Sequence, residues 1–385
     1  MKIGFFTSNK EWGGSESYLK SIIHGMREKG HNVVFFGVEG SRLFQEINAE
    51  GIECAAWTSS RYTRSDKGGL IEVILRAIPL YVTLLLGNLR EMMYLQKLFK
   101  INSVDVMHIN VSGYEVAAAS CRLRGIPCLA MNLITPPDEI YWFRRWMMKM
   151  TLRLSNHVSS KSNSCTEKWI ELACLNRNKC SYVWNSVDLS RFKYDETKHK
   201  NINDVFRLIS LGRLHPMKGY IYLLEAMKLL NDENITLDIY GEGHQREELR
   251  GLISDLGLKD KVSLFEHIEN PEDQLMIADC FVLPSVSHES CPAVLPEAMA
   301  CGLPLITSDF APLTEVNIDG TTGIVVPMRD SDALAGAIRC LYEDRNLAEN
   351  MGQAGYQRAR DHFSRERMIE ETASIYQELW TKKVT

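Results

Sequence analysis

The chain has 385 residues, of which 45% are hydrophobic and 24% are charged, and its formal net charge at pH 7 is −5. This length exceeds what one ordinary core accommodates and predicts two or three domains, and the composition is typical of globular α/β proteins. The negative net charge argues against a general nucleic-acid-binding protein, so we expect no nucleic-acid partner.

The cysteines and the apolar segments bear on the expected cellular location of the protein. The ten cysteines are scattered, form no C-x-x-C pair and lie partly in apolar runs, where free cysteine behaves as a small hydrophobic residue. The first residues lead into a strand-like run without the features of a signal peptide. The most apolar segment, 77–87, is shorter than the about 20 residues that span a bilayer. We therefore expect reduced thiols and a cytoplasmic protein, with peripheral contact at the inner face of the plasma membrane left open.

The first half of the chain alternates strand-like and helical patterns. Residues 15–29 place apolar side chains on one helical face, and Gly30 follows as a C-terminal stop. Four short apolar runs predict strands that are buried on both faces: 2–7, 32–37, 105–110 and 128–132.

A polar stretch, 193–203, then predicts a linker, after which the alternation resumes. Predicted strands are 206–211, 236–240, 261–265, 280–284, 303–307 and 323–326, and predicted helices are 220–230, 245–256, 273–278 and 332–343.

Strands that alternate with helices predict two parallel sheets with right-handed crossovers, whose ligands gather beyond the carboxyl ends of the strands. We expect a first domain over 1–192, a second domain over 204–364 and the main site in the cleft between them. A final helix over 365–381 is expected to pack back on the first domain.

The segment 288–309 carries the strongest chemical signal. Glu289 and Glu297 enclose seven residues, and Pro296 suits the first turn of a helix, where its missing N–H costs nothing. Such a helix start presents free N–H groups that suit a phosphate, and the two carboxylates can accept hydrogen bonds from sugar hydroxyls. The alternative, on these residues alone, is a capped helix with surface acids.

Two cations and two glycines follow predicted strands. Arg213 and Lys218 suit phosphate oxygens; the alternative is a pair of solvated surface cations. Gly13 and Gly14 link the first strand to the first helix and permit close approach of an anionic ligand, although many strand–helix turns need glycine.

These motifs occur in the order of a known family. The segment around Glu289 and Glu297 resembles the E-x7-E signature of the retaining glycosyltransferases of family 4. The resemblance extends over essentially the whole chain, through 13–33, 183–192, 212–227 and 317–338. It implies a GT-B fold, in which two Rossmann-like domains with parallel sheets face each other across a deep cleft. The first domain would bind the acceptor and the second the donor.

The resemblance also implies roles for individual residues. Arg213 and Lys218 stabilise the leaving diphosphate in place of a metal ion, Glu289 contacts the donor sugar, and Glu297 contacts the ribose. Further donor contacts are implied at Gly13, Gly14, Gly212, Glu242, His267, Ile268, Ser290, Cys291 and Pro292.

The predicted strand 105–110 departs from the family pattern. Asn110 stands where many members carry His, and His108 lies two residues earlier on the same face. Because Asn cannot titrate, we do not expect general-base catalysis from this position, and the resemblance implies a front-face retaining mechanism without an enzyme base. Ser15, His108 and Asn110 are candidates for the acceptor side, with a core histidine as the alternative for His108.

A basic, aromatic segment over 141–154 has helical spacing and no acid. Such a helix suits an anionic membrane surface. The alternative is an amphipathic helix whose apolar face packs on the core of the first domain.

The sequence thus predicts a metal-independent, retaining hexosyltransferase that uses a UDP- or GDP-sugar as co-substrate and needs no cofactor. The expected acceptor is a saccharide, lipid-linked, in capsule, O-antigen or exopolysaccharide synthesis. Two other classes stay open: a nucleotide-sugar epimerase or dehydrogenase, and a non-catalytic nucleotide-sugar-binding protein. Arg246 stands where a dinucleotide fingerprint needs its third glycine after Gly241 and Gly243, which counts against a dehydrogenase.

Overall fold

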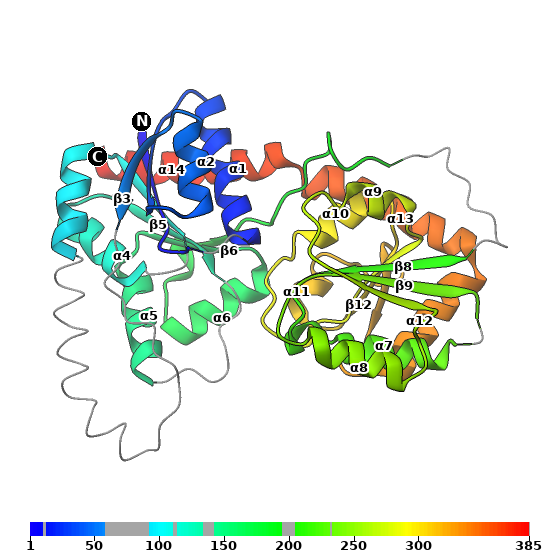
Figure 1. Ribbon diagram of the computed structural model, residues 1–385. Coiled ribbons are helices and arrows are strands. Elements are labelled where there is room, and N and C mark those ends of the chain that lie inside the picture. The colour runs from blue at the N-terminus through cyan, green and yellow to red at the C-terminus, as the bar shows by residue number, and fades with distance from the viewer. Residues whose placement is uncertain are drawn as a thin grey trace, which may run out of the picture.

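The computed structural model describes residues 1–10, 13–57, 92–110, 114–133, 142–194, 205–231 and 233–384. It consists of two lobes, each built on a parallel sheet with helices packed against it (Figure 1). The apolar segment 77–87, Trp12 and most of the predicted linker lie outside the described residues.

The sheet of the first lobe has seven strands in the order β3-β2-β1-β4-β5-β6-β7. They are β1 (Lys2–Phe6), β2 (Asn32–Val38), β3 (Glu53–Trp57), β4 (Val106–Asn110), β5 (Cys128–Leu133), β6 (His157–Ser160) and β7 (Cys180–Tyr182). The helices before the second lobe include α1 (Gly14–Glu28), α2 (Arg42–Ala49), α4 (Tyr114–Leu123), α5 (Trp142–Leu154) and α6 (Asn163–Ala173), and residues 92–102 are helical as well. The four predicted strands are present, and β3, β6 and β7 are additional.

Successive side chains of these strands enter opposite layers, as the pleat of a strand requires. In β1, Phe5 belongs to a core formed with α1 and α2, whereas Phe6 belongs to a second core formed with α4. The short apolar runs of the sequence are therefore buried on both faces, which is typical of parallel sheets.

The second lobe has a six-stranded sheet in the order β10-β9-β8-β11-β12-β13. Its strands are β8 (Phe206–Leu211), β9 (Ile235–Tyr240), β10 (Val262–Phe265), β11 (Cys280–Leu283), β12 (Leu305–Ser308) and β13 (Gly323–Val326). Its helices are α7 (Tyr220–Leu229), α8 (Arg246–Asp255), α9 (Glu272–Ile277), α10 (Val294–Ala300), α11 (Ala311–Thr314), α12 (Ser331–Glu343) and α13 (Arg345–His362). Every strand and helix that we listed for this half is present within two residues at each end.

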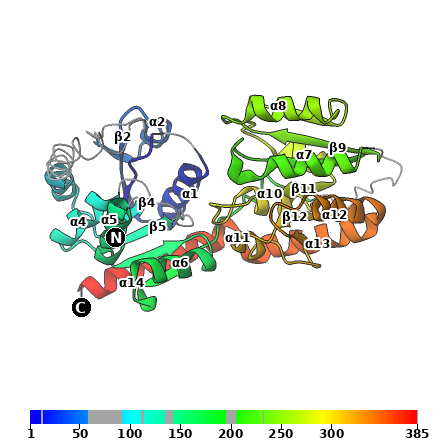
Figure 2. The same ribbon diagram turned by 90° about the horizontal axis from the view of Figure 1, so that it is seen from below.

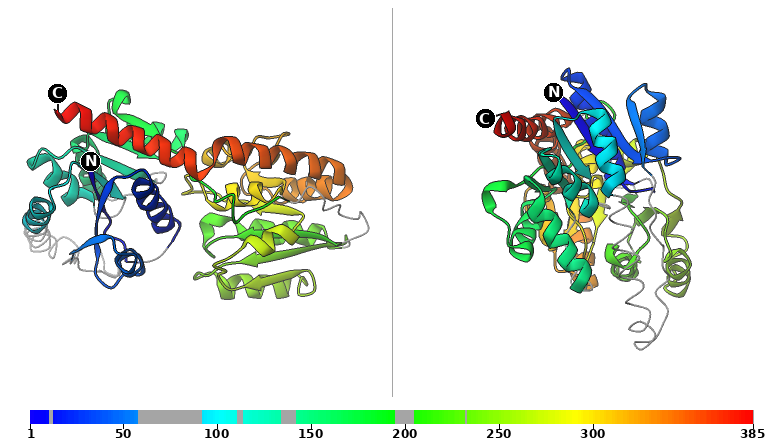
Figure 3. Two further views of the ribbon diagram at one scale, coloured as in Figure 1. Left: turned by 90° about the horizontal axis from the view of Figure 1, so that it is seen from above. Right: turned by 90° about the vertical axis from the view of Figure 1, so that its left-hand side faces the viewer.

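The last helix, α14 (Arg365–Val384), returns from the second lobe and lies along the first (Figures 2 and 3). Its Ile369 and Tyr376 are buried in the core that contains α1. At its start, Arg365 donates to both carboxylate oxygens of Glu28 at 2.9 and 2.8 Å. This helix therefore completes one layer of the first lobe.

The two chain segments that connect the lobes run side by side. Val187 forms a parallel bridge with Ser364, and its N–H donates to the carbonyl of Phe363 at 2.8 Å. The ring of Trp184 packs against that of Phe363 with their centroids 5.2 Å apart. The paired crossings form a narrow connection through which both lobes are joined.

Close approach of α1 and α14 depends on a glycine, which yields a test. A Cβ atom on Gly25 would lie 2.4 Å from two side-chain carbons of Ile369. We expect Gly25→Ala to lower the free energy of unfolding by about 1–3 kcal/mol through overpacking. This loss exceeds the up to about 1 kcal/mol that alanine gains over glycine in a helix. Urea denaturation of the two proteins measures the difference.

The matched control is Gly251→Ala in α8, where an added Cβ meets no atom within 4 Å. That variant is expected to gain up to about 1 kcal/mol. Shortening the opposing side chain in Gly25→Ala/Ile369→Ala should lessen the effect of the added methyl. Equal gains for both glycine variants would contradict the packing described above.

Candidate active site

The candidate site is built on two loops that leave the carboxyl ends of β8 and β11, which are neighbours in the sheet. After β8 the chain continues to β9, toward one edge of the sheet, and after β11 it continues to β12, toward the other edge. This reversal of strand order opens a ligand crevice in α/β folds. The loop after β8 contains Gly212, Arg213 and Lys218, and the loop after β11 contains the first glutamate of the E-x7-E segment. The two groups of predicted residues therefore share one edge of the second lobe.

Lys218 and Glu289 form a buried ion pair between these loops. The Nζ atom of Lys218 lies 2.5 Å from Oε1 of Glu289, and the two residues are 9% and 7% exposed. The hydroxyl of Ser285 donates to the same Oε1 at 2.9 Å. Withdrawn from water, each charge depends on the other. The structure thus fixes two predicted residues together.

Gly219 allows the two loops to approach. Its φ is +70°, and a Cβ atom there would lie 2.2 Å from the carbonyl oxygen of Pro284. The N–H of Val286 donates to the carbonyl of Met217 at 2.7 Å, which holds the loops in register. Only glycine combines this left-handed conformation with such a backbone contact. Lys218 is consequently placed directly against the loop that carries Glu289.

The G-E-G sequence after β9 has a packing role. Cβ atoms on Gly241 and Gly243 would lie 1.9 and 2.1 Å from the carbonyl oxygens of Gly212 and Leu214. The N–H of Leu214 donates to the carbonyl of Glu242 at 2.7 Å. These glycines bring the loops after β8 and β9 into contact.

Three predicted donor residues, Arg213, Glu242 and His267, are exposed on the loops after β8, β9 and β10, and Ile268 is half-buried. Burial, followed by the nearby charges of His244 and Arg213, lowers the pKa of His215. The edge thus gathers cationic and imidazole groups beside the buried pair.

The helix within the E-x7-E segment, α10, begins at Val294, so the predicted start at Pro296 is two residues late. Pro296 still lies in the first turn, together with Glu297. Burial raises the pKa of Glu297 to about 7, an effect that the charge of Arg191 reduces. Near neutral pH this carboxyl is therefore partly protonated.

The residues between the two glutamates are packed tightly. Ser290 and Cys291 are buried, and Pro292 is half-buried. The carbonyl of Cys291 accepts a hydrogen bond from the side-chain amide of Asn185 at 2.6 Å. Asn185 lies in the connecting segment, so this bond ties the loop to the connection between the lobes. We did not assign Asn185 from the sequence, although it lies in a segment that resembles the family.

On the first lobe, α1 begins directly after Gly13, whose φ of −169° is extended and which offers no side-chain cap. The side-chain amide of Asn110, at the end of β4, donates to the hydroxyl of Ser15 at 3.0 Å. The structure therefore brings Gly14, Ser15 and Asn110 together.

His108 is fully buried and lies apart from that group. Its Nδ1 is 2.6 Å from the hydroxyl of Tyr376 on α14, and its ring packs on Phe5. Burial lowers its pKa to about 3. This placement corresponds to the core histidine that the sequence allowed and not to an acceptor contact.

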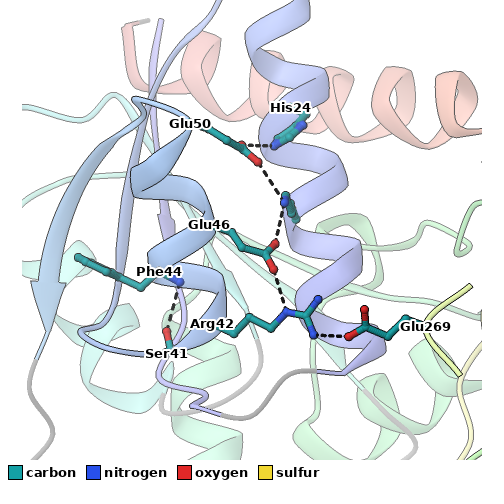
Figure 4. A network of polar contacts seen from close by, with 8 residues as sticks. His24, Ser41, Arg42, Phe44, Glu46, Glu50 and Glu269 are labelled. Atoms are coloured by element: carbon teal, nitrogen blue, oxygen red, sulfur yellow. Dashed lines mark hydrogen bonds and ion pairs between the residues drawn. The ribbon is translucent and has the colours of Figure 1, made fainter. Parts of the chain in front are cut away.

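Contacts between the lobes flank the site. Figure 4 shows Arg42 of α2 between Glu46 and Glu269, and the distance from its Nη1 to Oε1 of Glu269 is 2.8 Å. Glu269 follows His267 and Ile268 in the loop after β10. On the other side, the carboxylate of Glu315 accepts hydrogen bonds from the N–H groups of Asn163 and Ser164, both at 2.7 Å.

The sequence Asp330-Ser331-Asp332 is a D-x-D pattern, whose two carboxylates would suit a divalent metal ion. Here the carboxylate of Asp330 accepts a hydrogen bond from the N–H of Ala333 at 2.8 Å and caps α12. The hydroxyl of Ser331 donates to Glu225 at 2.6 Å. These residues form a helix cap at the start of α12.

Comparison with protein families agrees with this geometry. Residues 12–191 match the model described as Glycosyltransferase Family 4, and residues 193–358 match the model described as Glycosyl transferases group 1. The two matches together cover most of the chain. The chain belongs to the family 4 (group 1) glycosyltransferases and has their GT-B fold.

Similar proteins act in the synthesis of bacterial glycans. The chain is 24% identical over 282 residues to an Escherichia coli UDP-Gal:alpha-D-GlcNAc-diphosphoundecaprenol alpha-1,3-galactosyltransferase, covering 68% of this chain and 73% of the relative. It is 26% identical to the capsular polysaccharide biosynthesis glycosyltransferase CapM of Staphylococcus aureus, covering 64% and 68%. It is also 34% identical to the lipopolysaccharide core biosynthesis glycosyltransferase LpsD of Rhizobium meliloti, covering 42% and 46%.

Solved structures share the fold over nearly the whole chain. HepE from Anabaena in complex with UDP has a TM-score of 0.82 at 17% identity, with 98% of this chain and 100% of that chain covered. A sucrose-phosphate synthase from Thermosynechococcus elongatus has a TM-score of 0.78 at 18% identity, with 99% of each chain covered. No helix within the described ranges is both long and apolar enough to cross a membrane.

The buried imidazole of His108 predicts acid sensitivity. Its pKa of about 3 lies below the value of about 6.5 in an unfolded chain. The unfolded state therefore binds more protons, and the stability that the neutral ring provides is lost as pH falls below about 6.5. We expect His108→Gln to reduce the loss of unfolding free energy between pH 6 and pH 4 by up to about 1.4 kcal/mol per pH unit. Urea denaturation at several pH values measures this slope.

The control is His267→Gln, which changes an exposed histidine and is expected to leave the slope as it is in the wild type. Identical slopes for His108→Gln and the wild type would show that His108 does not contribute to the acid sensitivity. Burial also lowers the pKa of His157, to about 4, but His157 is unchanged in all three proteins and contributes equally to their slopes.

Proposed function

We propose that this glycosyltransferase transfers a hexosyl unit from a UDP- or GDP-sugar to a saccharide acceptor, with retention of the anomeric configuration. The buried pair of Lys218 with Glu289, at the carboxyl edge of the second sheet, carries the proposal. It holds a cation suited to phosphate and a carboxylate suited to sugar hydroxyls at the same point.

Each chemical group of the nucleotide-sugar donor has a protein partner in this proposal. Lys218 and the exposed Arg213 stabilise the charge that develops on the leaving diphosphate, without a metal ion. Glu289 orients the donor sugar, and Glu297 binds the ribose. With its pKa raised to about 7, Glu297 can accept a hydroxyl proton when ionised and donate one when protonated.

The proposed reaction needs no base from the protein. Asn110 does not titrate, and His108 is buried against α14. The bond from the anomeric carbon to the diphosphate breaks while the acceptor oxygen binds that carbon from the same face. The acceptor's proton passes to the departing phosphate. Closure of the lobes excludes water, which would otherwise hydrolyse the donor.

The proposed acceptor is a lipid-linked saccharide in the synthesis of a surface polysaccharide. Two similar proteins, from Escherichia coli and Campylobacter jejuni, are named for acceptors that carry diphosphoundecaprenol or diphospho-undecaprenol. Others are named for capsule and lipopolysaccharide core synthesis. UDP is the favoured nucleotide because structural relatives bind UDP or UDP-glucose.

Calorimetric binding of UDP, GDP and ADP in EDTA tests the donor site. We expect one nucleotide to bind the wild type and to bind Lys218→Met at least tenfold more weakly, a loss of about 1.4 kcal/mol. Because that variant removes the cation that balances the charge of Glu289 beside the phosphate, Lys218→Met/Glu289→Gln is the matched control. The double variant should recover part of the loss.

If none of the three nucleotides binds the wild type, the assignment of the donor site is wrong. Binding that needs a divalent ion would overturn the metal-independent mechanism. Epimerised nucleotide sugar in the absence of acceptor would identify an epimerase, and binding without turnover on a broad panel of acceptors would identify a binding protein.

The helix α5 supports a peripheral membrane contact on the cytoplasmic side. Trp146 and Met150 of α5 are 53% and 38% exposed, whereas Thr151 and Leu152 are buried. Lys149 and Arg153 lie on the same helix. Exposed apolar side chains beside cations suit the interface of an anionic bilayer.

Co-sedimentation with phosphatidylglycerol vesicles at low salt tests this contact. Trp146→Ser/Met150→Ser is expected to lower the bound fraction several-fold, because the apolar insertion is lost while the charges remain. Leu229→Ser/Ile277→Ser removes two exposed apolar residues from the second lobe and should bind like the wild type. Absence of binding by active wild-type protein would contradict the membrane contact.

A further inference from the structure

Lys161 is a buried cation on the first lobe that the mechanism above does not use. It follows β6 directly, and Ser162 after it caps α6. Its side chain is only 6% exposed, and its Nζ lies 4.2 Å from the centre of the Tyr18 ring. Among the described residues, none accepts a hydrogen bond from Nζ or forms an ion pair with it. A cation with so little access to water, and with no acceptor among the described residues, is costly, so its retention points to a ligand.

The surroundings of Lys161 place it between the lobes. Its charge and that of Glu16, in the first turn of α1, affect each other's pKa. The same holds for Lys161 and Cys291, which lies two residues after Glu289. Geometry agrees with this, because Lys161 lies over Tyr18 of α1, and β7, the strand beside β6, leads to Asn185, whose side-chain amide donates to the carbonyl of Cys291 at 2.6 Å.

Glu16 does not act as a close counter-ion. Its Oε1 accepts a hydrogen bond from the side-chain amide of Asn9 at 2.7 Å. Burial raises its pKa, which weakens its hold on a neighbouring cation. The N–H groups of the Lys161 ammonium are therefore available to donate hydrogen bonds to a ligand.

The start of α1 adds a second positive feature at this place. The helix has 15 residues, and its N-cap residue, Gly13, offers no side-chain cap. The N–H groups of Glu16 and Ser17 donate to the carbonyl of Gly13, both at 3.1 Å, and the helix dipole favours an anion at this end. A nearly buried ammonium beside the positive end of a helix favours a doubly charged, oxygen-rich group over a neutral sugar hydroxyl.

We propose that Lys161 binds a terminal phosphate oxygen of the donor's nucleoside diphosphate, from the side opposite Lys218. This inference rests on the proposed function and adds a first-lobe residue to the donor site. The diphosphate would then lie between cations of both lobes, so that its binding draws the lobes together and its leaving charge is stabilised from two sides.

Calorimetry with UDP and UMP tests this assignment, because the two ligands differ only in the terminal phosphate. We expect Lys161→Met to bind UDP about tenfold or more weakly than the wild type and to bind UMP within twofold. Lys161→Arg should keep most of the UDP affinity. Lys168→Met removes the same charge from an exposed position on α6 and should bind both ligands like the wild type.

Two further measurements separate a ligand contact from a structural role. Without ligand, Lys161→Met should unfold at the same temperature as the wild type or higher, because an unpaired buried charge has been replaced by an apolar side chain. Burial lowers the pKa of Lys161 to about 8, so wild-type UDP affinity should fall between pH 7 and pH 9. Lys161→Arg should hold its affinity over this range. The pKa of Cys291, about 12, and that of Tyr18 are raised by burial, so neither titrates there.

Equal UDP affinities of Lys161→Met and the wild type would overturn the inference and leave the proposed function standing. Parallel losses for UDP and UMP, or a lower unfolding temperature of Lys161→Met, would assign Lys161 a structural role and overturn it as well. If the wild type binds no nucleoside diphosphate, the proposed function fails, and the inference fails with it.

Discussion

The arrangement of the second lobe depends on one buried interaction, the ion pair of Lys218 with Glu289. A charge that is removed from water must keep its partner, so the loops after β8 and β11 have to stay at a constant separation. Glycine at position 219 permits the backbone contact that sets this separation. Parallel strands bring the two loops to one edge, glycine lets them touch, and the ion pair then determines where a phosphate and a sugar can bind.

Much of the fold was predictable because the apolar runs of the second lobe are well separated by helical patterns. The strands missed in the first lobe have a different composition. β3 contains two alanines, and β6 and β7 contain histidine, serine and cysteine in short runs that resemble loops. These strands owe their conformation to pairing with neighbours in the sheet more than to their own residues.

The predictable part of the site consists of residues whose motif is local in sequence, such as Lys218, Glu289 and Glu297. The roles of residues that depend on partners distant in the sequence could not be predicted. The environment of His108 is decided by Tyr376, which lies 268 positions away in the chain. Lys161 lies in a polar run, where a lysine normally indicates a solvated turn, and only its burial against Tyr18 of α1 reveals a buried cation.

The return of α14 to the first lobe affects the order in which the protein can fold as it leaves the ribosome. The first lobe emerges early, but one layer of its core needs Ile369 and Tyr376, which are synthesised after the whole second lobe. The second lobe has all its strands and helices in one continuous stretch, from β8 to α13. Its core can therefore close first, and the cleft between the lobes takes shape only when the final helix docks.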